Sequence, residues 1–293
     1  AAANIATAPT GLLIPPSNVM ITFSLVSGGT SVAALFMAGY IPGILWGLAC
    51  MIVIYIFAKK KGYKSTSSFK GKEKLMVIWQ AVPSLLMIVI VIGGIIGGIF
   101  TATEGSVVAV VYTLILSLFF YKTIKFKDLP EIFLASAEMT GIIVFLIGVS
   151  SIMSWVMAFT DIPTLVSNAL LGISNNKYVI FFIINIILLI VGTFMDMTPA
   201  TLIFTPIFLP ICQRLGMNVI HFGIMMIFNL CIGTITPPVG TTLFVGVKVG
   251  GTTIEKVIKP LLWYFAAIFA VLMLVTYVPQ ISLWLPGVMG YVK

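Results

Sequence analysis

The sequence predicts an all-α, polytopic membrane protein with an internal inverted repeat and discontinuous helices, and three observations support this fold class. The first is composition: the 293 residues are 60% hydrophobic and only 8% charged, with a mean hydropathy of +1.19. The second is a series of apolar stretches separated by short lysine clusters. The third is a Gly and Pro-Pro pattern that occurs near both ends of the chain.

Composition already excludes several classes of protein. A soluble domain carries about 25% charged residues, because its surface must face water. This chain has 16 basic and 8 acidic side chains, which are too few to cover a globule of its size. A soluble enzyme, a disordered chain and a nucleic-acid binder are therefore excluded. The net charge of +8 comes mostly from lysines in short clusters between apolar stretches.

Apolar stretches of membrane-crossing length recur along the chain. About 20 mainly apolar residues are needed to cross about 30 Å of hydrocarbon. Stretches of roughly this length, with a shorter one named last, are 33–57, 75–100, 139–158, 178–195, 261–279 and 106–121. Two further apolar regions, 1–27 and 219–248, are interrupted in the middle by glycine and proline.

The placement of lysines indicates the orientation. Cytoplasmic loops are enriched in Lys and Arg, so we place the strongest basic loop, 59–74, in the cytoplasm. Counting the membrane crossings from this loop then places the lysines of 122–127 and 248–259 in the cytoplasm as well. This count requires that the segment 178–215 enters and leaves the membrane on the same side. That region is either a re-entrant hairpin or two full spans. A hairpin with its tip at 196–199 is favoured, because its second limb, 201–212, is short and contains two prolines.

An internal repeat links the two interrupted regions. Segment 11–17 (GLLIPPS) resembles 233–239 (GTITPPV), and the same offset continues without a gap to 28–31 against 250–253, with six identical positions. The lysine-based orientation ends the first copy outside and the second inside, so the copies run in opposite directions. Inverted repeats with discontinuous helices are typical of secondary transporters whose binding site lies near the bilayer midplane.

Each Pro-Pro pair is expected to interrupt a helix, because proline lacks an N–H and clashes with the preceding turn. Carbonyls freed in hydrocarbon are costly unless protein or an ion satisfies them. Nearby hydroxyls, Ser17 in the first copy and Thr234, Thr236 and Thr241 in the second, would complete an oxygen-rich site suited to a hard cation such as sodium. The alternative is a proline kink whose carbonyls are satisfied by neighbouring helices.

At these residues the sequence resembles the large membrane subunit of TRAP (tripartite ATP-independent periplasmic) transporters, with a general similarity to the sialic-acid branch. The resemblance covers the whole chain and rests on the stretches IPPS at 14–17, GIFTATE at 98–104, TPIFLP at 205–210, HFG at 221–223 and the TPPVG-containing segment 229–240. The family pattern also includes further helices and a first hairpin before the point where this sequence begins. The first ion site is therefore expected to lack its hairpin half.

The resemblance implies an elevator mechanism in the bacterial inner membrane, in which a transport domain slides against a scaffold. It implies that Na⁺ gradients drive the import of an organic anion, with sialic acid favoured and a C4-dicarboxylate next. It also implies two partners, a small membrane subunit and a periplasmic substrate-binding protein. The expected domains are a first transport part at 1–57, a scaffold at 58–175 and a second transport part at 176–293, made of the hairpin 178–215, the broken helix 219–248 and the final span 261–279.

Asp196 is the strongest single candidate for an ion ligand. An acidic side chain at the bilayer centre costs at least about 2.5–3.5 kcal/mol on insertion scales, so it is expected to have a partner and a role. At the hairpin tip beside Thr198, it would supply the negative charge of a sodium site; the alternative is a helix cap in a polar pocket. The oxygens expected to complete this site belong to Gly233, Thr234, Thr236 and Gly240, and those of the first-repeat counterpart to Gly11, Ile14, Ser17 and Asn18.

The organic anion is expected beside the two breaks, where its contacts would be Pro15, Pro16, Pro237, Pro238 and Thr241. Sodium is the only metal expected. The three cysteines lie in apolar surroundings without the spacing of metal ligands, so no transition-metal site is predicted at Cys50, Cys212 or Cys231.

Other polar and glycine positions have a simpler interpretation. Thr101 and Glu104 have capping-box spacing at the start of an apolar run. The pairs Gly93/Gly97 and Gly94/Gly98 have the GxxxG spacing that allows close helix packing. His221 is interpreted as a polar cap or interface contact rather than a proton carrier.

Two other functions were weighed against the tripartite importer. A related inverted-repeat transporter could work without a binding protein. An intramembrane enzyme would need paired membrane aspartates, a Ser/His pair or an HExxH motif. Asp161 and Asp196 do not lie in comparable motifs, and no HExxH occurs in the sequence.

Overall fold

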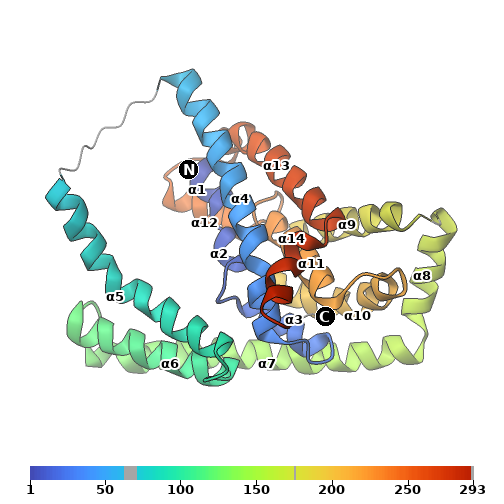
Figure 1. The fold of residues 1–293 in the computed structure, drawn as a ribbon, viewed down its shortest axis with the longest axis horizontal. Helices are drawn as coiled ribbons and strands as arrows, with labels where there is room; N and C mark the ends of the chain where they lie inside the picture. The colour runs from blue at the N-terminus through green and yellow to red at the C-terminus, as the bar shows by residue number, and fades with distance from the viewer. Residues whose placement is uncertain (63–70, 175, 292–293) are drawn as a thin grey trace. The chain divides into compact units, whose positions relative to one another are not determined.

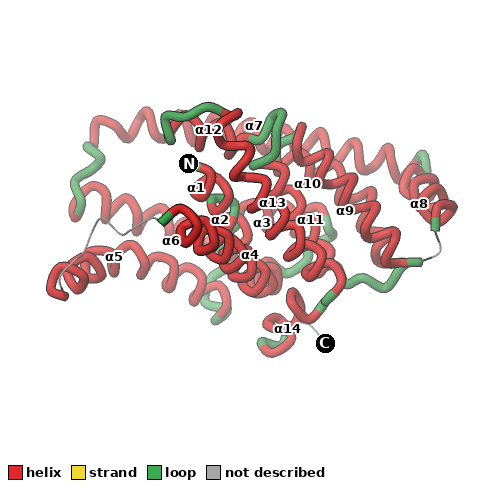
Figure 2. Tube along the Cα trace, turned by 90° about the horizontal axis from the view of Figure 1, so that it is seen from above, coloured by secondary structure: helices red, strands yellow, loops and turns green. Residues whose placement is uncertain are grey.

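The computed structural model describes residues 1–62, 71–174 and 176–291, and within these ranges every regular element is a helix (Figures 1 and 2). The predictions that fall on Lys64, Lys70 and residue 175 lie outside the described residues. The α-helices are α1 (Ala2–Thr7), α2 (Thr10–Leu13), α3 (Asn18–Val26), α4 (Val32–Lys61), α5 (Gly71–Ile96), α6 (Ala102–Ile115), α7 (Leu129–Phe159), α8 (Ile162–Ile173), α9 (Lys177–Phe194), α10 (Met197–Arg214), α11 (Val219–Thr234), α12 (Thr241–Val249), α13 (Ile254–Tyr277) and α14 (Gln280–Val288).

The chain forms two compact units. The first combines Ala1–Lys60 with Leu146–Lys293, and the second is Lys61–Phe145. The first unit therefore joins the two ends of the sequence, which contain both predicted helix breaks. The predicted scaffold, 58–175, concerns movement during transport and stays a prediction.

Helix α11 is the centre of the first unit. All its residues from Ile220 to Thr234 are buried, and it packs against α9, α10, α13, α2 and α3. A helix that is apolar on all sides either lies in a protein core or faces lipid as a membrane span, and the burial of α11 places it in the core of this unit. The surrounding helices also pack directly against one another, α10 against α3 and α1 against α13.

Both predicted breaks are present. The first separates α2 from α3 at residues 14–17, where the helix axis bends by 46°. The second separates α11 from α12 at residues 235–240. In both copies the Pro-Pro peptide bond is cis. The expectation of discontinuous helices at matched positions is therefore confirmed.

The two broken helices lie antiparallel and in contact. The Sγ of Cys231 is 3.8 Å from the carbonyl oxygen of Pro9, and these two residues occupy equivalent positions in the repeat. A Cβ added to Gly246 would meet Ile5, and one added to Gly223 would meet the ring of Phe23. As the residue number rises along the first copy, it falls along the second, so the opposite direction predicted from the lysines is present in the fold.

Two of the lysine clusters used for the orientation lie at the same end of this unit. The rings of Phe57, near the end of α4, and Trp263, near the start of α13, have centroids 6.4 Å apart. This contact brings the ends of α4 and α13 that carry Lys59 and Lys259 together. The orientation predicted from loop charge is consistent with this arrangement.

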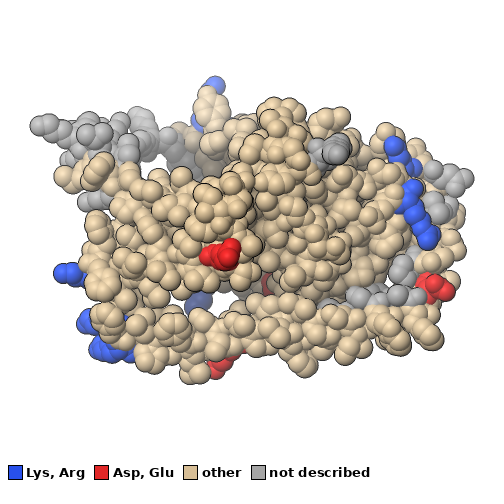
Figure 3. All heavy atoms as spheres, turned by 60° about the horizontal axis from the view of Figure 1, so that its bottom comes forward, with Lys and Arg blue, Asp and Glu red and all other residues tan. Residues whose placement is uncertain are grey.

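Five helices in the described ranges are long and apolar enough to cross a membrane, or six spans if the bent pair counts as one. Charged side chains are sparse on the face drawn in Figure 3. Two predicted boundaries are wrong: α7 begins at Leu129 rather than 139, and α13 begins at Ile254 rather than 261. Hydropathy marks the apolar part of a helix, and both helices continue into polar flanking sequence.

The limbs of the predicted hairpin are α9 and α10, each of 18 residues. The expectation of a short second limb at 201–212 is wrong, because α10 runs through Pro206 and Pro210 without ending. Helices near a membrane tolerate proline where neighbouring groups satisfy the freed carbonyls. A re-entrant hairpin rather than two full spans stays a prediction.

In the second unit the capping box is confirmed. The Thr101 hydroxyl accepts from the Glu104 N–H at 3.2 Å, and the Thr101 N–H donates to the Glu104 carboxylate at 2.8 Å. The GxxxG interpretation is wrong, because α5 ends at Ile96 and so excludes Gly97 and Gly98. A Cβ on Gly94 would meet Phe100 in the following turn, whereas the close contact between α5 and α6 is at Gly105, beside Ile95.

Replacing Trp46 tests the packing of the first broken helix. Its fully buried indole N–H donates to the Ala6 carbonyl at 2.8 Å, and its ring contacts Phe228. We expect Trp46→Phe to destabilise the protein by about 1–3 kcal/mol, because a buried carbonyl loses its donor while the aromatic contact is kept. Thermal unfolding in detergent measures the change. Trp284→Phe, at a position that is 59% exposed, is the matched control; an equal effect of both changes would contradict the assignment.

Candidate ion site at the second helix break

The second break begins because two donors are missing from the backbone. Pro237 and Pro238 have no N–H, so the carbonyls of Gly233 and Thr234 lack their α-helical partners four residues ahead. The Gly233 carbonyl accepts instead from the Thr236 N–H at 2.9 Å. Helix α12 then starts at Thr241, which leaves a short non-helical segment between two helix ends.

The oxygens of this segment converge on Gly240. A Cβ added there would lie 2.7 Å from the carbonyl oxygens of both Thr234 and Thr236. The hydroxyls of these two threonines donate to carbonyls of α11, Thr234 to Cys231 at 2.8 Å and Thr236 to Ile232 at 2.7 Å. Because each hydroxyl has only one proton, its oxygen remains available as an acceptor or ligand.

Asp196 lies between α9 and α10, at the tip that faces this break. It is exposed, and its side chain accepts no capping hydrogen bond from the first turn of α10, a turn that is fully described. The helix-cap alternative for this carboxylate therefore has no support in the structure. Asp196 carries a negative charge that no helix-capping contact uses.

Backbone contacts hold the tip against the break. The Val239 N–H donates to the Thr193 carbonyl at 3.3 Å. One turn away, a Cβ on Gly233 would meet the backbone of Gly192 directly, so α9 and α11 cross at a pair of glycines. A side chain at Gly233 would force the two helices apart, whereas a Cβ at Gly192 would lie 3.2 Å from the Gly233 Cα and would need only a small shift.

A small cavity of about 10 Å³ lies where the tip meets the break. About 10–15 Å³ is the volume that holds one water molecule, and an ion of similar size fits the same space. The residues that line the cavity are Gly192, Thr193, Met195, Asp196, Thr234, Val239, Gly240 and Thr241. The structure thus brings together Asp196, Thr234 and Gly240 of the predicted sodium site with Thr241, which was predicted to contact the organic anion.

The other predicted residues of this half lie nearby. Thr198 is half-buried in the first turn of α10 and does not line the small cavity. Pro237 and Pro238 line a larger neighbouring cavity of about 560 Å³ together with Thr236, Thr193 and side chains of α9, α11 and α13. Its volume lies in the range of small-molecule sites. None of its lining side chains is charged.

The first break has a different environment. Ser17 is 1% exposed, and its hydroxyl oxygen has no hydrogen-bond partner among the described residues. Gly11 and Asn18 are exposed, and Ile14 is half-buried. A Cβ on Gly39 of α4 would meet the Leu13 carbonyl, so α4 covers one side of this break. The predicted first-repeat set therefore combines the buried Ser17 with the half-buried Ile14 and the exposed Gly11 and Asn18.

A buried polar network that the sequence reasoning missed holds α11 in place. The Asn229 amide donates to the Asn185 side chain of α9 at 2.6 Å, and the Asn185 amide donates to the Thr276 hydroxyl of α13 at 3.1 Å. Asn229 lies one turn before Gly233 on α11. Asparagine within two strongly apolar helices was the available signal, because a polar group at such a position needs a partner.

Of the two roles predicted for His221, helix cap and interface contact, the structure does not support the cap. It is 2% exposed, and its Nε2 lies 2.8 Å from the Val275 carbonyl oxygen of α13. Asn218, not His221, caps α11, because the Asn218 side chain accepts from the Ile220 N–H at 2.8 Å. His221 is therefore a buried contact between α11 and α13.

Two antiparallel broken helices and a hairpin-like tip that meets one of the breaks define an inverted-repeat membrane transporter. Comparison with known proteins gives the family. Residues 1–281 match the family described as tripartite ATP-independent periplasmic transporter, DctM component. The chain belongs to this family. Because this is a family of transporters, the alternative of an intramembrane enzyme is wrong.

Individual relatives agree with the family assignment. The chain is 54% identical to the uncharacterized protein YgiK of Salmonella typhimurium, over 97% of this chain and 65% of the relative. It is 38% identical to the C4-dicarboxylate TRAP transporter large permease protein DctM of Pseudomonas aeruginosa, over 96% and 65%. It is 35% identical to the sialic acid TRAP transporter large permease protein SiaM of Vibrio cholerae, over 96% and 66%. The chain thus spans just under two thirds of the length of these relatives.

A double-mutant cycle tests the polar network. We expect Asn185→Ala and Asn229→Ala to show a coupling of about 0.6–1.7 kcal/mol, the range of side-chain hydrogen bonds between membrane helices. Equilibrium unfolding in mixed micelles measures the free energies. A second cycle that pairs Asn185→Ala with Asn218→Ala should give no coupling, because Asn218 bonds to its own helix. Additive effects of the first pair would rule out the network.

Proposed function

We propose that this chain is the permease part of a sodium-coupled importer of organic acids. The observation that carries the proposal is the small cavity that Asp196 lines together with Thr234, Val239, Gly240 and Thr241 of the broken helix. Hard cations bind carboxylate and carbonyl oxygen, and unwound backbone carbonyls coordinate sodium in inverted-repeat transporters. The proposed ligands are Asp196 with oxygens of Gly233, Thr234, Thr236 and Gly240, and Thr198 lies close enough along the chain to contribute.

The first break is proposed as the counterpart ion site. The unpartnered hydroxyl oxygen of Ser17 supports this, because a buried polar atom without a hydrogen bond is costly. The carbonyls of Gly11 and Leu12 lose their helical donors at Pro15 and Pro16, as in the second copy. Ile14 and Asn18 flank the same segment.

The proposed substrate is an organic anion with a carboxylate. C4-dicarboxylates and sialic acid, named for two of the relatives, are both carboxylates. The larger cavity beside Pro237 and Pro238 is the proposed location. Thr241, the other predicted contact of the anion in this half, lines the small cavity instead. Sialic acid is the first substrate to test and a C4-dicarboxylate the second, because 35% and 38% identity do not separate them.

The proposed mechanism is an elevator in the bacterial inner membrane. The first unit, which carries both breaks, contains the parts that would move together. A small membrane subunit and a periplasmic binding protein are the proposed partners, as the tripartite nature of the family implies. Membership of this family disfavours a permease that works without a binding protein.

Replacing the carboxylate at the hairpin tip by an uncharged amide of the same shape tests the ion site. We expect Asp196→Asn to lower sodium affinity about tenfold or more, equal to about 1.4 kcal/mol, because the site loses its formal negative charge. Sodium-dependent uptake by the complete transporter in proteoliposomes measures it. Asp161→Asn is the matched control, since Asp161 caps α8 in a left-handed conformation that asparagine also adopts. Unchanged sodium dependence in Asp196→Asn would remove Asp196 from the site.

The coupling itself is tested with ion gradients. We expect uptake to require sodium and to increase with an inside-negative potential, because each net positive charge moved inward gains about 2.3 kcal/mol per 100 mV. Replacing external sodium by potassium or choline, with the potential set independently by an ionophore, separates the two driving forces. Uptake that ignores both would overturn the proposed function.

A further inference from the structure

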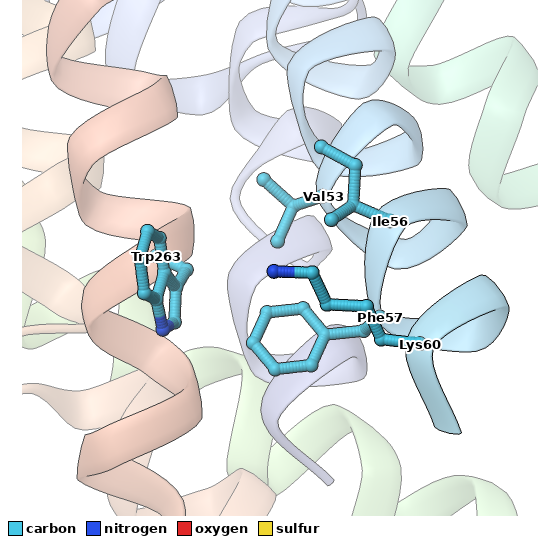
Figure 4. A pocket seen from close by; sticks show the side chains of 5 residues that line it. All are labelled: Val53, Ile56, Phe57, Lys60 and Trp263. Carbon is cyan, nitrogen blue, oxygen red and sulfur yellow. The ribbon is translucent and has the colours of Figure 1, made fainter.

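An apolar groove with a charged end lies between α4 and α13, away from both breaks. It has a volume of about 190 Å³ and is lined by Val53, Ile56, Phe57 and Lys60 of α4 and by Trp263 of α13. All five residues belong to the first unit. Figure 4 shows the four side chains of α4 facing the gap across from Trp263, with the nitrogen of Lys60 turned toward it.

The α4 wall is one continuous stripe of the helix. Positions 53, 56, 57 and 60 are spaced as i, i+3, i+4 and i+7, so their side chains lie on one face. The stripe changes along its length from the buried Val53 to the exposed Ile56 and finally to the charge of Lys60. An apolar surface thus ends in a single cation.

The α13 wall has the same layout. Trp263 is 64% exposed, although its ring contacts Phe57 at a centroid distance of 6.4 Å. Lys259 and Lys256 precede it by four and seven residues, so they lie on the same helix face. Tryptophan next to lysine at a helix end is the arrangement found at the boundary between hydrocarbon and head groups.

The charge at this end of the groove is strongly positive. Lys59 and Lys60 lie in the last turns of α4, and Lys256 and Lys259 in the first turns of α13. Among the described residues of these turns, Glu255 is the one acidic side chain. A ligand that matches the groove therefore needs an apolar body and an anionic head at one end.

We propose that this groove binds an anionic phospholipid. One acyl chain lies along Val53, Ile56, Phe57 and Trp263, and the phosphate contacts Lys60, with Lys256 and Lys259 close to the head group. Basic pockets between membrane helices on the cytoplasmic side bind acidic head groups in this way. The lysine-rich ends of α4 and α13 face the cytoplasm in the orientation derived from the sequence, so the lipid comes from the inner leaflet.

The shape of the groove supports a lipid over other anions. A small soluble anion would contact only the lysines and would gain nothing from the apolar wall. With such an anion bound, Trp263 and Ile56 would stay exposed, whereas an acyl chain would cover them. The lysine side chains are long enough to reach a phosphate at the interface while their methylene groups stay on the apolar wall. This proposal rests on the fold and does not depend on the ion site.

Brominated lipids test the proposal, because bromine on an acyl chain quenches tryptophan fluorescence on contact. The complete transporter is placed in nanodiscs of phosphatidylcholine that contain a small fraction of brominated phosphatidylglycerol or brominated phosphatidylcholine. The difference between the wild type and Trp263→Phe isolates the signal of Trp263. We expect the anionic lipid to quench this signal at about fivefold lower mole fraction, the preference of about one lysine near the surface.

Variants show whether the lysine causes the preference. We expect Lys60→Gln to reduce the fivefold preference for the anionic lipid toward a ratio of one, and Lys60→Arg to retain the preference. Lys177→Gln, at the start of α9, should leave the preference unchanged. Equal quenching by the two lipids, or a preference that survives Lys60→Gln, would overturn the proposal. Absence of quenching by both lipids would show that a protein partner covers the groove, and that result would overturn it as well.

Discussion

The fold depends on what happens to a backbone carbonyl when proline removes its hydrogen-bond donor inside a membrane. A continuous helix satisfies its own backbone, whereas a Pro-Pro pair leaves two carbonyls without partners where water is scarce. At the second break the Gly233 carbonyl accepts from the Thr236 N–H at 2.9 Å instead of from an α-helical donor, and at each break a glycine leaves room beside a carbonyl. Gly39 lies against the Leu13 carbonyl, and Gly240 lies beside the carbonyls of Thr234 and Thr236. These glycines are needed because any side chain would fill the space that the oxygens face.

The second break is useful because a separate element is held against it. The contact between Gly192 and Gly233 lets α9 and α11 approach closely. The Asn185–Asn229 hydrogen bond sets their register, two turns before Gly192 on α9 and one turn before Gly233 on α11. With this register the tip between α9 and α10 meets residues 235–240, and Val239 bonds to Thr193 across the junction. The position of the Asp196 carboxylate therefore depends on backbone contacts and on one buried amide pair rather than on bonds made by Asp196 itself.

Features with a local cause were predictable from the sequence. The Pro-Pro breaks, the apolar helices and the Thr101–Glu104 capping box each depend on residues a few positions apart. Helix ends were less predictable: α10 continues through Pro206 and Pro210, and α13 begins seven residues before its apolar stretch. The gathering of Asp196 with Thr234 and Gly240 followed from the hairpin model. The link between Asn185 and Thr276 could not be predicted, because these residues are 91 positions apart and nothing local indicates the pairing.

The arrangement of the two cavities suggests how the proposed cation and anion are coupled. Thr193 lines both the small cavity of Asp196 and the larger cavity beside Pro237 and Pro238. The segment from Thr236 to Gly240 lies between them. A cation in the small cavity would neutralise Asp196 and so remove a negative charge from the border of the larger one. An organic anion would then enter a cavity whose own lining holds no charged side chain. The cation in the small cavity would increase the affinity for the anion, because opposite charges attract strongly across a few ångströms of low-dielectric protein. In this proposed arrangement the broken backbone that would bind the cation would also form a wall of the anion site, so that sodium binding and substrate binding would both depend on the segment from Thr236 to Gly240.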